Sequence, residues 1–146
     1  METLRELMKK VLADTFAMYL KAHNYHWNVE GSNFPQYHEF FGNLYIELHG
    51  AVDPIAEQIR TLDSYAPGSF SRFKELTDIE DEVSVPMGVE MARRLQSDNE
   101  IVLATLNMAL KLAQQFEKPG LEDFLTGRID IHNKHGWMLR SIAKNV

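Results

Sequence analysis

The chain has 146 residues, 45% of them hydrophobic, with 8 Gly and 5 Pro. These values fit one domain spanning residues 1–146 with its own core, and they exclude a disordered or multidomain chain. The chain lacks cysteine, which excludes disulfides, thiolate zinc sites and thiol catalysis, so any metal must bind to His, Asp or Glu. The formal net charge of −6 opposes attraction to nucleic-acid phosphates.

No apolar run approaches the roughly 20 residues that a membrane-spanning helix needs. The opening residues, Met1 to Glu6, are typical of an amphipathic helix and contain no apolar core of a signal peptide. We therefore expect a soluble, cytoplasmic protein without a membrane partner.

Two long helices are predicted for the first part of the chain. Apolar side chains recur at alternating gaps of three and four from about residue 2 to about residue 29. A second helix, with Pro35 in its first turn, is predicted to reach about residue 63, and Gly31 lies in the turn between the two. Pro54 falls inside the second helix and removes a backbone hydrogen bond there, so a kink is expected beside it.

A long crossover and two further helices complete the predicted fold. The acidic, turn-rich segment 64–86 contains Phe70, Phe73 and Leu76 at the spacing of one short amphipathic helix. A third long helix follows over about 87–116, and a fourth occupies the remainder to the chain end. This connectivity is typical of an all-α, ferritin-like four-helix bundle with one long crossover.

Four side chains form the candidate metal site: His26, His38, Asp53 and Glu57. Mixed imidazole and carboxylate ligands suit Fe²⁺, which needs open positions for its oxidant. Asp53 and Glu57 lie one turn apart on one helical face, so both can reach one cation. The Glu-x-x-His pairs of an intra-bundle di-iron site do not occur in this chain, so iron must bind elsewhere.

Each of these residues also has a purely structural interpretation. A single core histidine is most often a hydrogen-bonded packing residue, and a pair of acids four residues apart is most often a solvated face. Their joint occurrence beside Trp27 and Asn28 favours the metal site. His132 with His135 is interpreted as a surface or packing pair, and the pairing of His23 with His26 stays ambiguous.

One segment and several later residues form a distinctive combination. The segment is Lys21 to Gly31, with sequence KAHNYHWNVEG, and the later residues are Phe34, His38, Glu39, Tyr45, Asp53, Ala56 and Glu57. This combination resembles the signature of the Dps-type mini-ferritins, and the likeness covers essentially the whole chain. The resemblance implies iron sites between two subunits, with the histidines of one facing the carboxylates of its twofold mate. It implies a first iron on His26, Asp53 and Glu57, a second on His38 and the bridging Glu57, and Trp27 close by to supply or quench an electron.

The same resemblance implies a ferroxidase and iron store. Fe²⁺ is oxidised to Fe³⁺, with hydrogen peroxide preferred over oxygen, inside a hollow homododecamer that protects against oxidative damage; Zn²⁺ is a possible surrogate metal. Two alternatives stay open: a DNA-binding protective shell, and a metal-binding shell with weak ferroxidase activity. Lysine-rich tails of the kind that bind DNA in the family are absent from this sequence, so DNA binding is expected to be weak or absent.

Three positions need separate expectations. Gly42 stands where the family has an acid four residues after the second histidine, so the second iron position is weakened, and Gly42→Asp is expected to strengthen it if there is room. His49, one turn before Asp53, can supply a compensating nitrogen or serve as a surface residue. Asp123, or Asp130, is the candidate acid of an iron-admitting pore, with ordinary helix-start acids as the alternative.

Overall fold

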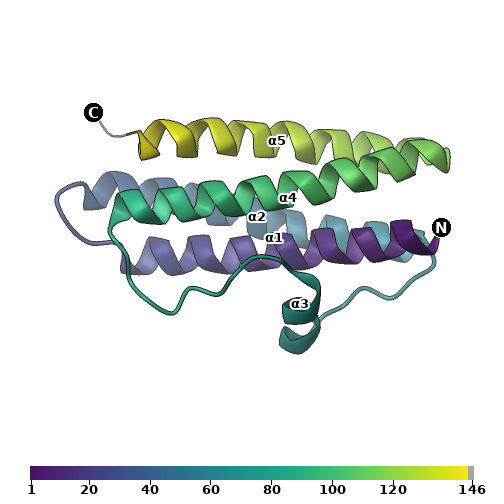
Figure 1. Cartoon of the computed structure of the whole chain (residues 1–146), viewed down its shortest axis with the longest axis horizontal. Coiled ribbons are helices and arrows are strands. Elements are labelled where there is room, and N and C mark those ends of the chain that lie inside the picture. Colours follow the sequence, from purple (N-terminus) through teal and green to yellow (C-terminus); the bar gives the residue numbers. More distant parts are fainter. Residues whose placement is uncertain (145–146) are drawn as a thin grey trace.

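The computed structural model describes residues 1–144, and every regular element in this part of the chain is helical (Figure 1). The elements are α1 (Glu2–Asn28), α2 (Phe34–Thr61), α3 (Phe70–Leu76), α4 (Gly88–Gln115) and α5 (Pro119–Ala143). The prediction of four long helices with a short one in the crossover is therefore confirmed. The last helix was expected to continue to the chain end; it ends at Ala143, and residues 145–146 lie outside the described part.

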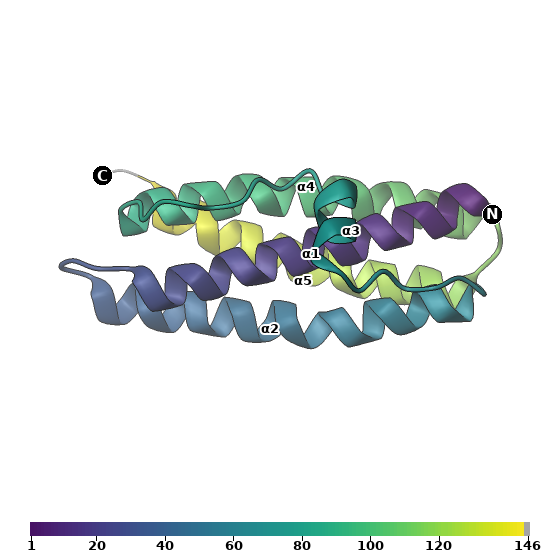
Figure 2. The same ribbon diagram turned by 90° about the horizontal axis from the view of Figure 1, so that it is seen from below.

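The helices form two antiparallel hairpins, α1 with α2 and α4 with α5, which pack together mainly through α1 and α4 (Figure 1). Because α2 ends at the opposite end of the bundle from the start of α4, the connection between them runs along the whole bundle (Figure 2). It passes over the α1 side and carries α3, which packs on α1. This long connection leaves the outer face of α2 uncovered within one chain.

The core follows from the apolar stripes of the helices. Fully buried side chains include Leu4, Met8, Met18, Tyr25, Phe41, Leu48, Ile55, Ile59, Met91, Leu95 and Leu106. The crossover is attached to this core by buried Asp14, whose carboxylate accepts hydrogen bonds from the hydroxyls of Thr77 (2.6 Å) and Thr105 (2.9 Å). A buried carboxylate is stable only with such partners, so Asp14 fixes the crossover against α1 and α4.

The helix ends agree with their local sequence. Ser69 caps α3 by accepting a hydrogen bond from the backbone N–H of Arg72, and Pro35 and Pro119 lie in the first turns of α2 and α5. The α2 helix continues through Pro54 as one element. In the described part of the chain, no helix has the length and apolar character required to cross a membrane.

Candidate metal centre

His26 on α1 and His38 on α2 lie against each other with their rings stacked, 3.8 Å between centroids. Each Nδ1 lies 2.7 Å from the backbone carbonyl oxygen of the other histidine. Since a carbonyl only accepts, each Nδ1 carries the proton and donates it, which leaves the lone pair of each ring on Nε2. This reciprocal arrangement holds two imidazoles in the tautomer and orientation that a metal ligand needs.

Gly42 makes this arrangement possible. It is buried on α2 one turn after His38, and a Cβ built on it would lie 2.9 Å from Nδ1 and 3.0 Å from Cε1 of His26. Any side chain at this position must displace the His26 ring. Gly42→Asp was expected to strengthen the second metal position only if there was room for the side chain, and this condition is not met.

Asp53 and Glu57 are exposed on the same face of α2 but far from the histidines of their own chain. With a rise of 1.5 Å per residue, the fifteen residues from His38 to Asp53 separate them by about 22 Å. In residues 1–144, no three or more His, Asp or Glu side chains are grouped so that they could hold a metal ion. The structure thus brings together two of the four predicted ligands, and one chain alone cannot complete the set.

A group of aromatic rings surrounds the histidine pair. The His23 ring stacks on Tyr45, with 3.7 Å between centroids and 6° between planes, and Trp27 lies 4.0 Å away from His23. The hydroxyl of Tyr19 lies 3.1 Å from His23 Nδ1, and the ring of exposed His49 packs 4.8 Å from Tyr19. His23 is therefore bonded to Tyr19 and is not paired with His26 as a chelate.

The protonation of His23 is set by its surroundings. Burial, followed by the neighbouring rings of His26 and His49, lowers the pKa of His23. The imidazole is therefore neutral near pH 7.

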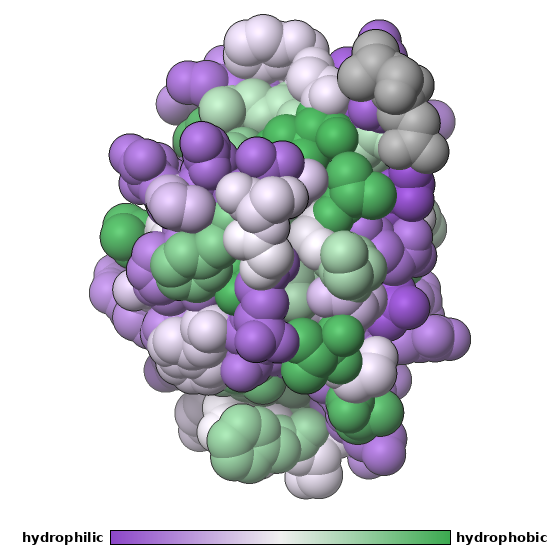
Figure 3. Space-filling view, turned by 90° about the vertical axis from the view of Figure 1, so that its left-hand side faces the viewer, coloured by the Kyte–Doolittle hydropathy of each residue, from purple (hydrophilic) through white to green (hydrophobic). Residues whose placement is uncertain are grey.

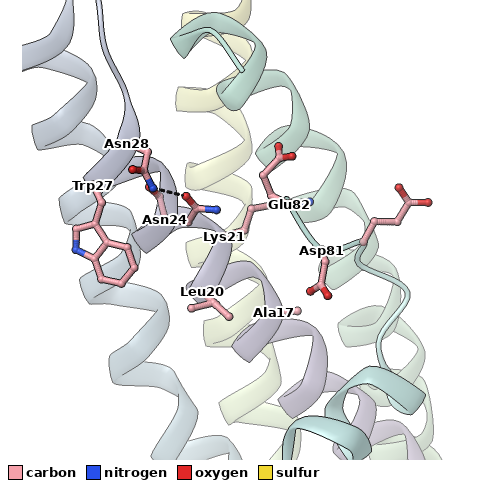
Figure 4. A pocket seen from close by; sticks show the side chains of 9 residues that line it. Ala17, Leu20, Lys21, Asn24, Trp27, Asn28, Asp81 and Glu82 are labelled. Atoms are coloured by element: carbon pink, nitrogen blue, oxygen red, sulfur yellow. Dashed lines mark hydrogen bonds between the residues drawn. The ribbon is translucent and has the colours of Figure 1, made fainter. Parts of the chain in front are cut away.

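Trp27 itself is 58% exposed and borders a surface pocket of about 300 Å³ between α1 and the crossover (Figure 4). The other pocket residues include Asn24 and Asn28, joined by a 2.8 Å hydrogen bond, and the acidic segment 80–82 of the crossover. Figure 4 shows Trp27 and the acids at opposite sides of the α1 ribbon. The predicted histidine and carboxylate ligands lie outside this pocket.

A second group of histidines lies inside the bundle. His132 is fully buried: its Nδ1 donates to the amide oxygen of Asn99 (2.7 Å), and Arg128 donates to its Nε2 (3.1 Å). Arg128 also donates to both carboxylate oxygens of Glu47, at 2.5 and 3.2 Å, and His135 Nε2 lies 2.7 Å from Glu47. The packing interpretation of His132 and His135 agrees with these contacts, although both residues are buried and neither is on the surface.

The charges of this interior cluster are fixed by its contacts. Burial alone would raise the pKa of Glu47, but hydrogen bonds from His135 and Arg128 lower it to about 2. Burial, and then the adjacent Arg128, lowers the pKa of His132 to about 3. The sequence analysis did not predict that Glu47, Arg128 and Asn99 belong to this cluster. The one indication in the sequence was Arg128, which lies one helical turn before His132 on an apolar face of the helix.

No hydrogen bond in the described part of the chain joins Glu122, Asp123 or Asp130 of α5 to either group. Asp123 and Asp130 are exposed, and Glu122 accepts a 3.3 Å hydrogen bond from Gln114. Their role as pore residues stays a prediction.

Comparisons with known proteins agree with this architecture. The ferritin-like domain family matches residues 5–146. A low-temperature-induced protein of Nostoc is 34% identical over 140 residues, covering 94% of this chain and 78% of the relative. The DNA protection during starvation protein 2 of Bacillus anthracis is 30% identical, covering 93% of each chain.

Solved structures give the same result. The Dps protein of Vibrio cholerae, described as a member of a superfamily of ferritin-like diiron-carboxylate proteins, superposes with a TM-score of 0.94 at 26% identity, over 98% of this chain and 90% of the other. The Dps protein of Bacillus brevis superposes with a TM-score of 0.93 at 26% identity, over 98% and 96%. The match spans nearly the whole length, in sequence and in structure, so the chain belongs to the ferritin-like family and, within it, to the Dps-type mini-ferritins.

Proposed function

We propose that this chain oxidises Fe²⁺ at sites shared between two copies of itself and stores the ferric product inside a closed shell, with one ferritin-like domain over residues 1–146. The observation that carries the proposal is the split ligand set. His26 and His38 are held as ready ligands near the start of α2, and the Asp53 and Glu57 carboxylates lie about 22 and about 28 Å farther along that helix. A second copy, turned so that its α2 runs antiparallel, supplies the missing half.

In this assembly, the first iron binds to His26 of one copy and to the Asp53 and Glu57 carboxylates of its mate. The second iron binds to His38 and shares Glu57 as a bridge. Gly42 supplies no ligand atom, so water completes the second position and its occupancy is lower. The first iron therefore has more protein ligands than the second, and this difference is specific to this chain because it results from Gly42.

The surface supports contact between copies. Trp27 is 58% and Ile46 60% exposed, both on the helices that carry the ligands. At the end of the bundle that carries the α1–α2 turn, hydrophobic residues are mixed among hydrophilic ones on the surface (Figure 3). In this proposal these side chains become buried where the copies meet. We propose a homododecamer, the assembly expected from the family resemblance.

Hydrogen peroxide is the preferred oxidant in this proposal. Peroxide takes up two electrons and two protons to give two water molecules, and two Fe²⁺ ions supply both electrons. Oxidising two irons side by side therefore consumes peroxide without releasing hydroxyl radical. The protein contributes geometry, and the metal supplies the redox chemistry.

The test combines size and chemistry. Light scattering on the metal-free protein should give the mass of a large closed shell, and stopped-flow absorbance should show faster Fe²⁺ oxidation with peroxide than with oxygen. Zn²⁺ added first should slow the reaction by occupying the same ligands. A stable monomer at micromolar concentration, or oxidation no faster than in protein-free buffer, would contradict the proposal.

DNA protection is a second candidate, because relatives carry it in their names. The net charge of −6 per chain is repeated in every copy of the shell, and this repels the phosphate backbone. Without a basic surface to contact the phosphates, we expect no retarded DNA in a gel-shift assay at about 150 mM salt. Retardation without added divalent metal would favour the DNA-binding shell.

A shell that binds metal but oxidises it slowly is the third candidate, since Gly42 removes an acid from the second position. Metal soaks separate it from the main proposal. One full and one partial metal per site, together with fast peroxide-dependent oxidation, fits the ferroxidase; the same occupancy with slow oxidation fits the binding shell. Equal, full occupancy of both positions would point to His49 as the replacement ligand.

A further inference from the structure

We propose that Tyr19 and His23 form a proton-coupled electron donor beside the iron site: Tyr19 loses one electron to the oxidised centre while its phenolic proton passes to His23. The inference rests on the proposed function, because the iron site supplies the oxidant. The evidence for the electron donor is separate, since it comes from the contacts of Tyr19 and His23. It assigns a role to two residues that hold no iron.

The hydrogen bond between the two side chains sets the proton path. The Tyr19 hydroxyl lies 3.1 Å from His23 Nδ1, four residues along α1 and partly buried. A phenol is a better donor than a neutral imidazole, so the hydroxyl donates and Nδ1 accepts. Loss of an electron makes a phenol strongly acidic, and a base already in hydrogen-bond contact then takes the proton without any movement of the backbone.

The packing of the rings sets the electron path. Tyr45 lies 5.2 Å from the predicted ligand His26 and is stacked on His23 at 3.7 Å. Tyr19 in turn lies 5.6 Å from His23 and 6.2 Å from Tyr45, measured between ring centroids. An electron can therefore pass from Tyr19 to His26 through a series of neighbouring aromatic rings.

The chemistry explains why such a donor is useful in this chain. Because Gly42 leaves the second position poor in ligands, a site will often hold one Fe²⁺ when peroxide arrives. One Fe²⁺ supplies one electron and Tyr19 supplies the other, so Fe²⁺, H₂O₂, the Tyr19–His23 pair and two protons from solvent give Fe³⁺, a phenoxyl radical beside protonated His23, and two water molecules. The phenolic proton is held by His23 until the radical is reduced again, and no hydroxyl radical leaves the site.

Trp27 is the competing donor, since it contacts the other side of His23 at 4.0 Å. Its indole is 58% exposed, so a radical there would meet solvent and other solutes. Tyr19 is partly buried between Phe16, at 5.5 Å, and His49, at 4.8 Å, which shields its radical.

The test uses the assembled shell with less than one Fe²⁺ per site, mixed with excess peroxide and frozen rapidly for electron paramagnetic resonance. The unmodified protein should give a tyrosyl signal, identified by its change on incorporation of ring-deuterated tyrosine. Tyr19→Phe should lose this signal while keeping the ring that packs against Phe16 and His49. Trp27→Phe, the control at the competing donor, should retain it.

A metal-free experiment decides the inference even if iron is not oxidised. In a Tyr65→Phe background, which removes a tyrosine that is 82% exposed, flash photolysis with a ruthenium photo-oxidant in solution should produce phenoxyl absorbance that falls in Tyr19→Phe and forms more slowly in His23→Gln, because an amide is not a base. A signal unchanged by Tyr19→Phe, or one lost only in Trp27→Phe, would overturn the inference. Iron absorbance recorded in the first experiment reports separately on the proposed ferroxidase.

Discussion

Two groups of histidines and carboxylates in this chain differ in what their polar atoms already bind. The interior cluster joins Glu47, Arg128, His132 and His135 with Asn99, and its hydrogen bonds run between side chains of three helices. The outer group uses only Nδ1 of His26 and His38, each bonded to a backbone carbonyl. Its carboxylates, Asp53 and Glu57, are exposed on α2.

The comparison shows that residue type alone does not identify a metal ligand. In the interior cluster the Arg128 guanidinium supplies the cation that the Glu47 carboxylate needs, so a metal has nothing to add. In the outer group the imidazoles are oriented by their Nδ1 hydrogen bonds, and each Nε2 lone pair is free to coordinate a metal. A histidine whose two ring nitrogens are both hydrogen-bonded, such as His132, has a structural role, whereas an oriented histidine with one free ring nitrogen can bind a metal.

The largest effect is expected from removing the proposed bridge. Glu57→Ala should slow peroxide-driven Fe²⁺ oxidation by at least about 100-fold, because it removes a ligand from both positions. The same substitution should leave the unfolding midpoint almost unchanged, since Glu57 is exposed. Glu100→Ala, another exposed helical acid, is the control and should alter neither quantity.

The histidines should rank below Glu57 in the same assay. His26→Ala should slow oxidation more than His38→Ala, because His26 serves the better-supplied first position. Equal effects, or a larger one for His38→Ala, would contradict the proposed asymmetry.

Substitutions in the interior cluster should lower the stability of the protein, whereas those at Glu57 lower its activity. Arg128→Ala leaves the Glu47 carboxylate half-buried without its main cation, and the expected loss is about 3 kcal/mol of unfolding free energy. Arg93→Ala breaks an exposed pair with Glu90 at 3.4 Å and should cost less than about 1 kcal/mol. Denaturant titration measures both; equal losses would mean that the interior pair contributes no more than a surface one.

Gly42 offers an intermediate effect at the outer group. Gly42→Ala places a Cβ 2.9 Å from His26 Nδ1, so the ring must move and its bond to the His38 carbonyl weakens. Zinc affinity, measured by competition with a chelator, should fall about tenfold, the scale of losing a contact that orients a ligand. Gly50→Ala on the same helix meets nothing within 4 Å and should leave affinity unchanged. Tighter binding in Gly42→Ala or Gly42→Asp would show that the His26 ring is not held as described.

The last expected effect is gradual: it is the dependence of stability on pH. The pKa of His132 is about 3 in the fold, against about 6.5 for a free histidine, so between these values the unfolded chain binds a proton that the fold does not. Stability is therefore full above about pH 6.5 and falls toward pH 3, with a slope of up to about 1.4 kcal/mol per unit from this residue. His132→Gln should remove this component from unfolding curves recorded between pH 7 and 5. A slope that is unchanged in the variant would assign the acid sensitivity to other groups.

The sequence by itself determined the helices and the ligand candidates. Helix periodicity and end signals are local properties, so the stripe of α1, the position of Pro35 and the short helix in the crossover were all predictable. The spacing of Asp53 and Glu57 on one helical face was likewise a local consequence of 3.6 residues per turn. The role of the acids near the start of α5 and the sharing of the site between copies stay predictions, because they depend on surfaces of other chains.

Tertiary structure decided which side chains meet. The reciprocal hydrogen bonds of His26 and His38 exist because α1 and α2 pack as a hairpin. The same packing explains Gly42, because a side chain at this position would collide with the His26 ring. The Glu47 and Arg128 pair depends on the contact between α2 and α5, which are 81 residues apart at these positions. Long-range contacts of this kind follow from the way whole helix faces fit together, and no short stretch of sequence encodes that fit.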